Sequence, residues 1–278
     1  MKNTFSLFAV MLSIFLVFTS ISGTAQIIGN RLVKEESREI SNSFQQIRST
    51  GPVDIILKQG SVTTVVVRAD ANIIPYISTT VKNGTLTVST KRNIRFAKVM
   101  EVYVTTPEIN QISASGSGDI RCKDVFKTPN MKILASGSGD VSANLESKDV
   151  IIKLSGSGDV TVNCIHGSVQ MVVSGSGDVK AGRLQLMKCT VKNEGSGDIF
   201  LYGKTAALAI VSAGSGDIDA SQLMAVDVKA TNSGSGDIAV HPIQKLDAAL
   251  AGSGDLTYYG NPAALKTQST GSGDILKR

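Results

Sequence analysis

The sequence predicts an all-β fold, a right-handed parallel β-helix in which coils of about 19 to 20 residues stack behind a β-rich N-terminal cap. The main observation is the tetrapeptide Gly-Ser-Gly-Asp, which occurs nine times at spacings of 18 to 21 residues. Aliphatic residues alternate with polar ones on both sides of each tetrapeptide, as in strands with one buried face. A fixed period near twenty residues is typical of stacked structural units.

The composition narrows the class of protein. A chain of 278 residues has room for one large domain or two ordinary ones. With 42% hydrophobic residues and a mean hydropathy of +0.11, it does not have the composition of a disordered protein. Aromatic residues make up only 5%, which disfavours a pocket enzyme. The net charge of +5 includes no long basic run, and we therefore expect no nucleic-acid partner.

Residues 1–25 read as an export signal. Lys2 precedes an apolar run over residues 7–18, and Gly23-Thr24-Ala25 offers small residues for cleavage before Gln26. The run is shorter than the ~20 residues that a spanning helix needs. We therefore expect an exported protein of the periplasm or cell surface, with no membrane span after cleavage.

The mature chain, residues 26–278, is expected to form one domain. Residues 26–110 lack the tetrapeptide and are predicted to form the atypical cap that a solenoid needs. Within them, Thr50-Gly51-Pro52-Val53-Asp54-Ile55 resembles a degenerate first corner, and Asn83-Gly84 predicts a hairpin turn. Residues 111–278 hold the nine repeats.

Each repeat predicts a strand, a glycine corner, a second strand and a connection whose length absorbs the variation in spacing. Five residues before the aspartates, the expected inward face carries the polar residues Asn193, Ser212, Asn232 and Ser269, which we expect to bond to the corner backbone. The residue after the aspartate is aliphatic in all nine repeats: Ile120, Val141, Val160, Val179, Ile199, Ile218, Ile238, Leu256 and Ile275.

Two other folds fit less well. A leucine-rich repeat needs regular leucines and a helical or tight return segment, and neither recurs here. An antiparallel sandwich would place its turns irregularly, whereas nine identical corners imply one corner stacked on itself. The crossover rule for parallel strands then predicts a right-handed helix.

The aspartates of the corners form a predicted ladder. Carboxylates ~5 Å apart repel by about 0.8 kcal/mol in water and roughly 3 kcal/mol at an effective dielectric of 20. Each could accept N–H bonds from its own corner, where glycine permits positive φ, and we favour this interpretation. The alternative is a Ca²⁺ ladder, although calcium-binding nonapeptide repeats have a different pattern. The nine residues are Asp119, Asp140, Asp159, Asp178, Asp198, Asp217, Asp237, Asp255 and Asp274.

No catalytic or cofactor-binding residues are predicted. His166 and His241 occupy different phases of the repeat, and the corner serines have no base in register to activate them. Cys122, Cys164 and Cys189 match no metal-binding spacing and are interpreted as small apolar core residues.

Binding selectivity is expected outside the identical corners. The connections at residues 123–130, 144–149, 182–188 and 259–264 differ from coil to coil. Leu134, Ile151 and Val172 are expected to stack into one outward apolar strip, covered by residues 26–110 or by a second copy in a homo-oligomer.

Several motifs resemble a known family. They are Phe44-Gln45-Gln46-Ile47, Gly51-Pro52-Val53-Asp54-Ile55, Asn83-Gly84-Thr85-Leu86, Val102-Tyr103-Val104, the Gly-Ser-Gly-Asp series and Tyr258-Tyr259-Gly260-Asn261-Pro262. In this order they are similar to bacterial proteins of the "putative auto-transporter adhesin, head GIN domain" family. The resemblance implies an exported, non-enzymatic β-helix with a structural or adhesive role at the cell envelope. Its expected partner is an envelope or extracellular protein or glycan. The alternative is a carbohydrate-active or carbohydrate-binding β-helix.

Overall fold

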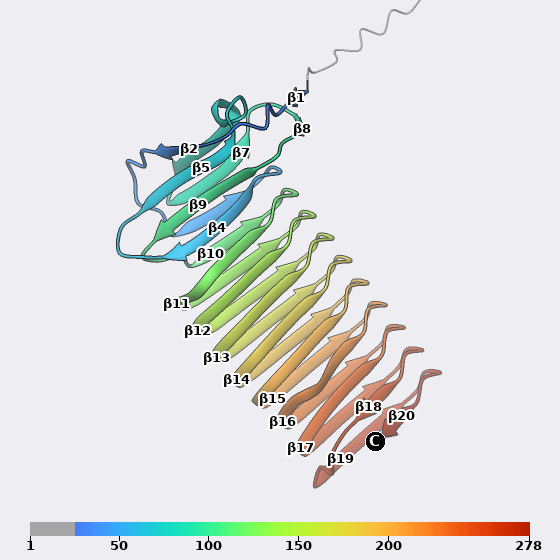
Figure 1. The fold of residues 1–278 in the computed structure, drawn as a ribbon. Coiled ribbons are helices and arrows are strands. Elements are labelled where there is room, and N and C mark those ends of the chain that lie inside the picture. The colour runs from blue at the N-terminus through green and yellow to red at the C-terminus, as the bar shows by residue number, and fades with distance from the viewer. Residues whose placement is uncertain (1–25) are drawn as a thin grey trace, which may run out of the picture.

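The computed structural model describes residues 26–278, and the predicted export signal at residues 1–25 lies outside the described residues. Stacked parallel coils fill most of the described chain, which confirms the predicted solenoid (Figure 1). The elements are β1 (Ile27–Ile28), β2 (Val33–Arg38), β3 (Gln46–Ser49), β4 (Asp54–Gln59), β5 (Thr64–Asp70), the 3₁₀ helix η1 (Ile74–Tyr76), β6 (Ile77–Lys82), β7 (Thr85–Thr90), β8 (Ile94–Phe96), β9 (Met100–Thr106), β10 (Gln111–Ala114), β11 (Ile120–Ala135), β12 (Val141–Leu154), β13 (Val160–Val173), β14 (Val179–Asn193), β15 (Ile199–Ser212), β16 (Ile218–Asn232), β17 (Ile238–Leu250), β18 (Leu256–Tyr258), β19 (Ala264–Ser269) and β20 (Ile275–Lys277).

Strands β11 to β17 each run from one glycine corner to the next. The predicted connections at residues 123–130, 144–149 and 182–188 are therefore strand, while residues 259–264 largely separate β18 from β19. The variation in repeat length is absorbed by bulges within these segments, such as the register shift between Arg121 and Val125. The strand before each corner keeps an unbroken register, because its buried face cannot slip by one residue.

The core follows the period-two pattern along the stack. Ile120, Val160 and Ile199 have no exposed surface, and their equivalents from Val141 to Leu256 are also buried. The equivalent in the final corner, Ile275, is half-buried. Burial of an aliphatic side chain contributes about 1.5 to 3 kcal/mol, so this single column supplies a continuous stabilising term through the solenoid.

The stack begins before the first Gly-Ser-Gly-Asp. Strands β3 and β4 flank the degenerate corner, and Ile47 pairs with Ile112 while Ile55 pairs with Ile120. The prediction of a degenerate first corner is confirmed. Strands β7 and β9 pair in parallel with β3 and β4 and form a further coil on the other side. The order of coils in space therefore differs from their order in the chain.

Antiparallel strands close this end of the solenoid. Strand β6 pairs with β7, β5 pairs with β9, and β2 pairs with β5. The predicted hairpin turn is confirmed, with φ of 50° at Asn83 and 70° at Gly84. Strand β2 presents Lys34, Glu35 and Glu36 to solvent, and such a charged edge discourages pairing with another chain.

A buried aspartate fastens the start of the described chain to the cap. Asp70 is fully buried and accepts hydrogen bonds from the backbone N–H groups of Arg31 at 3.0 Å, Lys98 at 3.2 Å and Val99 at 3.3 Å. A buried carboxylate is tolerated only with such donors. Asp70 thus joins the segment after β1 to the segment between β8 and β9. Strands β1 and β8 form a small separate sheet.

Candidate functional site

The glycine corners stack backbone on backbone. The N–H of Ser138 donates to the carbonyl of Gly116 at 3.0 Å, and the same bond recurs in the following corners. A Cβ on Gly139 would lie 2.2 Å from the Gly118 carbonyl oxygen. The expectation that these glycines adopt positive φ is wrong, since the described glycines with positive φ all lie outside the corners. Glycine is required by the closeness of the preceding coil.

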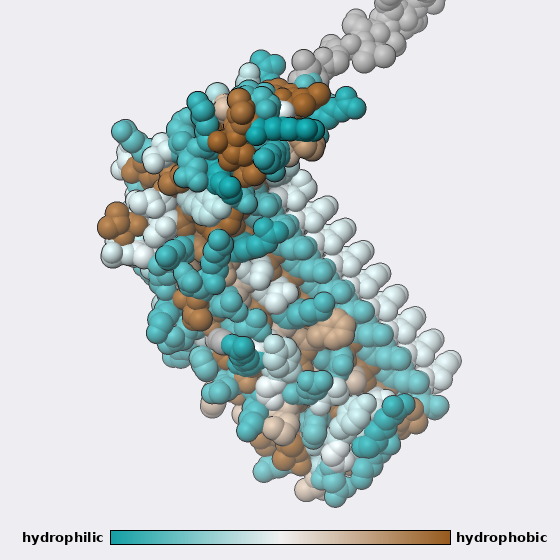
Figure 2. Space-filling view, viewed as in Figure 1, coloured by the Kyte–Doolittle hydropathy of each residue, from teal (hydrophilic) through white to brown (hydrophobic). Residues whose placement is uncertain are grey.

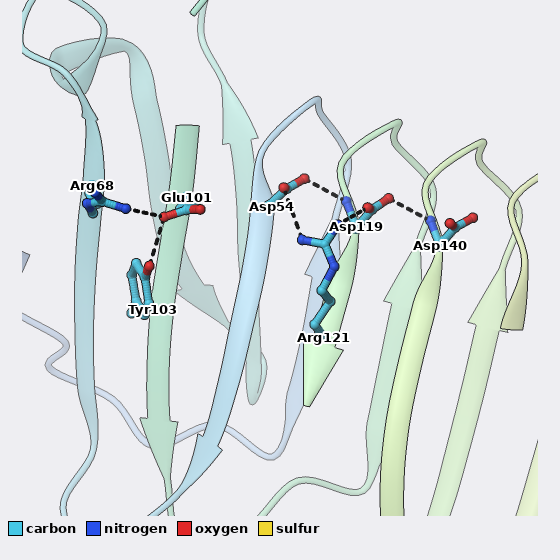
Figure 3. A network of polar contacts seen from close by, with 7 residues as sticks. All are labelled: Asp54, Arg68, Glu101, Tyr103, Asp119, Arg121 and Asp140. Carbon is cyan, nitrogen blue, oxygen red and sulfur yellow. Dashed lines mark hydrogen bonds and ion pairs between the residues drawn. The ribbon is translucent and has the colours of Figure 1, made fainter. Parts of the chain in front are cut away.

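The aspartates bond to the next coil rather than to their own corner, which corrects the predicted turn. In each case Oδ1 accepts the backbone N–H of the following aspartate, at 2.7 to 2.9 Å. Asp54 is the first acceptor, and Figure 3 shows its bond to Asp119 and that of Asp119 to Asp140. The ladder therefore runs from Asp54 to Asp274 through all nine repeats.

Charge along the ladder is compensated at its beginning by Arg121. This guanidinium pairs with Asp54 at 3.4 Å and with Asp119 (Figure 3). Beyond it the aspartate side chains are half-buried or exposed, so water screens their repulsion. Among residues 26–278, no three His, Cys, Asp or Glu side chains are grouped as a metal site would require. Calcium binding by the ladder stays an alternative that titration can test.

Buried polar side chains support several corners from inside. Asn193 Nδ2 donates to the carbonyls of Gly197 and Gly216, both at 3.1 Å, and its Oδ1 accepts the N–H of Gly195. Asn232 makes the equivalent bonds to its own corner. The prediction that these residues bond to the turn is confirmed for both asparagines and for Ser269, whose Oγ donates to the Gly273 carbonyl at 3.2 Å. Ser212 differs, because its buried Oγ has no hydrogen-bond partner.

A polar cluster lies on the outer face of the cap strands. Glu101 accepts hydrogen bonds from Arg68 at 3.0 Å and from Tyr103 at 2.8 Å (Figure 3). The bond to Glu101 raises the pKa of the Tyr103 phenol and also raises the pKa of Arg68. The ammonium of Lys123 lies 5.7 Å from the Tyr103 ring centroid, which links the cluster to the first repeat.

Among the side chains that the structure describes, neither the histidines nor Cys122 and Cys189 belong to a cluster that could hold a metal ion. His241 Nδ1 lies 3.1 Å from the Ser221 carbonyl, and His166 borders a surface hollow on a different part of the coil. Burial raises the pKa of the Cys122 and Cys189 thiols to about 12. These two thiols are therefore core residues, as predicted, while the side chain of Cys164 is not among those described.

Several hollows open on the surface of the solenoid. Two of them lie along one row of paired residues, here called the polar row: Asp149, Ser168, Lys188, Ala207, Asp227 and Lys245. Hollows of about 380 and 210 Å³ lie along this polar row and share Lys188. A third, of about 440 Å³, adjoins the row at Lys148 and is lined by two predicted connections and His166. Figure 2 shows apolar surface only as separate patches between hydrophilic side chains on the face it presents.

The predicted apolar strip is wrong. Leu134 and Val172 lie in one row with Lys153 between them, and Ile151 lies in the next row between Lys132 and Gln170. The reason is register, since Leu134 and Val172 precede their aspartates by six residues and Ile151 precedes its aspartate by eight. Ile151 is 38% exposed, so the N-terminal part does not cover it. A homo-oligomer contact through these residues stays a prediction.

The chain is similar to a family and to several solved structures. A family model described as "Putative auto-transporter adhesin, head GIN domain" matches residues 43–202 and 188–262. No protein with a curated description matches the chain. Within residues 26–278, no helix has the length and apolar character to cross a membrane.

The similar structures come from Bacteroides and Parabacteroides. A putative adhesin from Bacteroides fragilis NCTC 9343 is 25% identical, with a TM-score of 0.52, over 91% of this chain and 100% of that one. A putative adhesin from Parabacteroides merdae ATCC 43184 is 22% identical, with a TM-score of 0.69, over 91% and 99%. A putative lipid binding protein from Parabacteroides distasonis ATCC 8503 is 24% identical, with a TM-score of 0.66, over 91% and 100%. The last two similarities show a shared fold.

Proposed function

The chain belongs to the head GIN domain family of putative auto-transporter adhesins, and we propose that it is a non-enzymatic binding module exported to the bacterial cell envelope. The family and the structural neighbours support an adhesin-like exported protein. The envelope location, the absence of catalysis and the binding surface belong to our proposal.

The polar row is the observation that carries the proposal. It crosses six coils without a gap in pairing, and it offers carboxylate, hydroxyl and ammonium groups on every coil except that of Ala207. Two open hollows lie along it and share Lys188. A long, open surface of this kind suits an extended polymer, whereas a small substrate is usually enclosed in a cleft.

The arrangement of polar groups favours binding over catalysis. Catalysis by a nucleophile needs a base within hydrogen-bond reach. In the part of the chain that the structure describes, neither histidine bonds to a serine hydroxyl or to a carboxylate. The corner aspartates are engaged in the inter-coil ladder, which further supports a structural use for the repeated carboxylates.

Proteinase K treatment of intact cells tests the location. We expect degradation of the protein before lysis, while a cytoplasmic marker stays intact. Protection in intact cells, with degradation after the outer permeability barrier is opened, would confine the protein to the periplasm and remove the surface role.

Substitution of lysines on and beside the polar row tests the binding surface. We expect Lys148→Ser, Lys188→Ser and Lys245→Ser together to weaken sedimentation with purified envelopes of the source strain at least tenfold, because these exposed cations border the hollows. The matched control replaces Lys58, Lys82 and Lys91, which are exposed on the cap. Equal loss in both variants would show general charge attraction and contradict the assignment.

A further inference from the structure

An exposed aromatic ring stands out on the outer face of β15. Beyond residue 110 the aromatic residues are Phe126, Phe200, Tyr202, Tyr258 and Tyr259. Phe126 and Tyr258 are buried, whereas 43% of Tyr202 is exposed. One exposed ring alone is ordinary. A ring fixed beside polar groups can form part of a binding site.

Tyr202 is held against the neighbouring coil. Its ring occupies the space where a Cβ of Gly182 would be, since that Cβ would lie 1.9 Å from Cζ. The hydroxyl reaches one coil further and donates to Asn163 Oδ1 at 3.1 Å. Asn163 in turn donates to Asn144 at 3.2 Å. The ring therefore lies along the sheet in a fixed position, which lowers the entropy cost of binding on its free side.

The other nearby ring already has a partner. Lys180 Nζ lies 5.6 Å from the centroid of the Phe200 ring, a cation–π contact. Phe200 is half-buried beside it. Tyr202 is thus the aromatic ring with an accessible face, here called the platform, and Phe200 and Lys180 lie beside it.

A small hollow with polar groups opens beside the platform. It has a volume of about 120 Å³ and is lined by Phe200, Leu201, Tyr202, Asp219 and Gln222. It coincides with a bulge, because Phe200 pairs with Asp219 but Tyr202 pairs with Gln222. Asp219 Oδ1 accepts the Ser221 N–H at 2.9 Å, which fixes the carboxylate at the rim. The volume equals that of about four waters in the liquid, enough for a short substituent.

We propose that this site binds a pyranose unit of a glycan. A sugar ring has an apolar C–H face that stacks on an aromatic face, and its hydroxyls donate to a carboxylate and exchange bonds with an amide. Tyr202 supplies the face, Asp219 and Gln222 supply the polar contacts, and the hollow takes one exocyclic group. This inference rests on the proposed function and specifies its ligand class.

Other ligand classes fit the site less well. An added peptide strand needs an unpaired edge, but β15 is paired on both sides with β14 and β16. A nucleic acid needs a basic groove for its phosphates, and Asp219 stands at the rim. A glycan needs neither.

Binding of the full exported chain to a printed array of bacterial, mucin and plant oligosaccharides tests the site. We expect wild type to bind a subset of pyranose glycans, and Tyr202→Ala to weaken this at least tenfold. Tyr202→Phe keeps the ring and should stay within about fivefold. Tyr259→Ala removes a half-buried ring at the equivalent position of a later coil and should bind like wild type.

A second variant guards against a folding defect. Gly182→Ala places a methyl group in the ring's position and should weaken glycan binding while Tyr202 itself remains. The circular dichroism spectra of Tyr202→Ala and Gly182→Ala should match that of wild type, so that a loss of binding reports on the site and not on folding. Equal binding by wild type and both variants, or no glycan bound by wild type, would overturn the site.

Treated envelopes separate this inference from the proposed function. Periodate, which cleaves vicinal diols of sugars, should abolish the part of envelope binding that depends on Tyr202, and protease treatment of the envelopes should leave it. The reverse pattern would identify a protein ligand and overturn the glycan site, while the surface location would still stand on the proteinase K result.

Discussion

At the scale of single residues, the space beside the preceding coil determines which residues a corner of the repeat can contain. Both glycines of a corner face carbonyl oxygens of the coil before, and each aspartate gives one oxygen to the coil after. The middle serine of the corner is exposed, and only its backbone takes part in the stack.

Gly158→Ala should therefore be strongly destabilising. Its Cβ would lie 2.2 Å from the Gly139 carbonyl oxygen, and neither backbone can move without disturbing the ladder. We expect a loss of about 3 kcal/mol or more in urea unfolding, at the upper end of overpacking costs. The control is Ser157→Ala in the same corner, which should change stability by less than about 0.5 kcal/mol. A tolerated Gly158→Ala would contradict the close-approach explanation.

The buried asparagine and serine should respond in opposite directions. Asn193→Ala leaves two carbonyls and one N–H without partners and should cost about 1 to 3 kcal/mol. Ser212→Ala removes a buried hydroxyl that has no partner, so stability should stay equal or rise. Thermal or urea unfolding of the two variants decides between this account and a general need for polar residues at the position.

At the scale of elements, the alternation of aliphatic residues is sufficient to predict the strands, since burial on one face fixes their phase. The partner of each aspartate could not be predicted, because a periodic sequence does not say whether a side chain turns to its own corner or the next. The order of β3, β4, β7 and β9 was also hidden, since β7 and β9 carry no corner motif. The sequence did contain a signal for Tyr202, since this aromatic residue occupies the same position of its repeat as Gly182 does in the repeat before.

Asp70→Ala should destabilise the small sheet of β1 and β8 and leave the stacked coils unchanged. The substitution removes the acceptor of three backbone N–H groups that tie the segments around β1 and β8 to the cap. We expect faster hydrogen exchange in residues 27–32 and 94–99, with exchange in β12 to β16 unchanged. Equal acceleration throughout would show that the cap and the coils unfold as one unit.

At the scale of the whole molecule, stability should fall at alkaline pH partly through the core thiols. The native pKa of Cys122 and Cys189 is about 12, against 9.0 for the ordinary thiol. The contribution is complete below pH 9 and is lost as pH rises toward 12, because the unfolded chain ionises first. Cys122→Ala with Cys189→Ala should show a smaller alkaline loss than wild type in urea unfolding between pH 8 and 10.5. If the double variant lost as much stability at alkaline pH as wild type, the loss would come from groups other than these thiols.

The central claim is that the stacked corners are held by the protein's own bonds, which leaves recognition to the outer faces. Thermal unfolding in chelator and in millimolar calcium tests it most directly. We predict the same midpoint within about 1 °C, because each aspartate from Asp54 to Asp255 already accepts an N–H from the next coil. A single site would add about 2.7 kcal/mol when free calcium is at one hundred times its Kd. A midpoint that rises by several degrees with calcium would contradict the claim and establish the metal ladder.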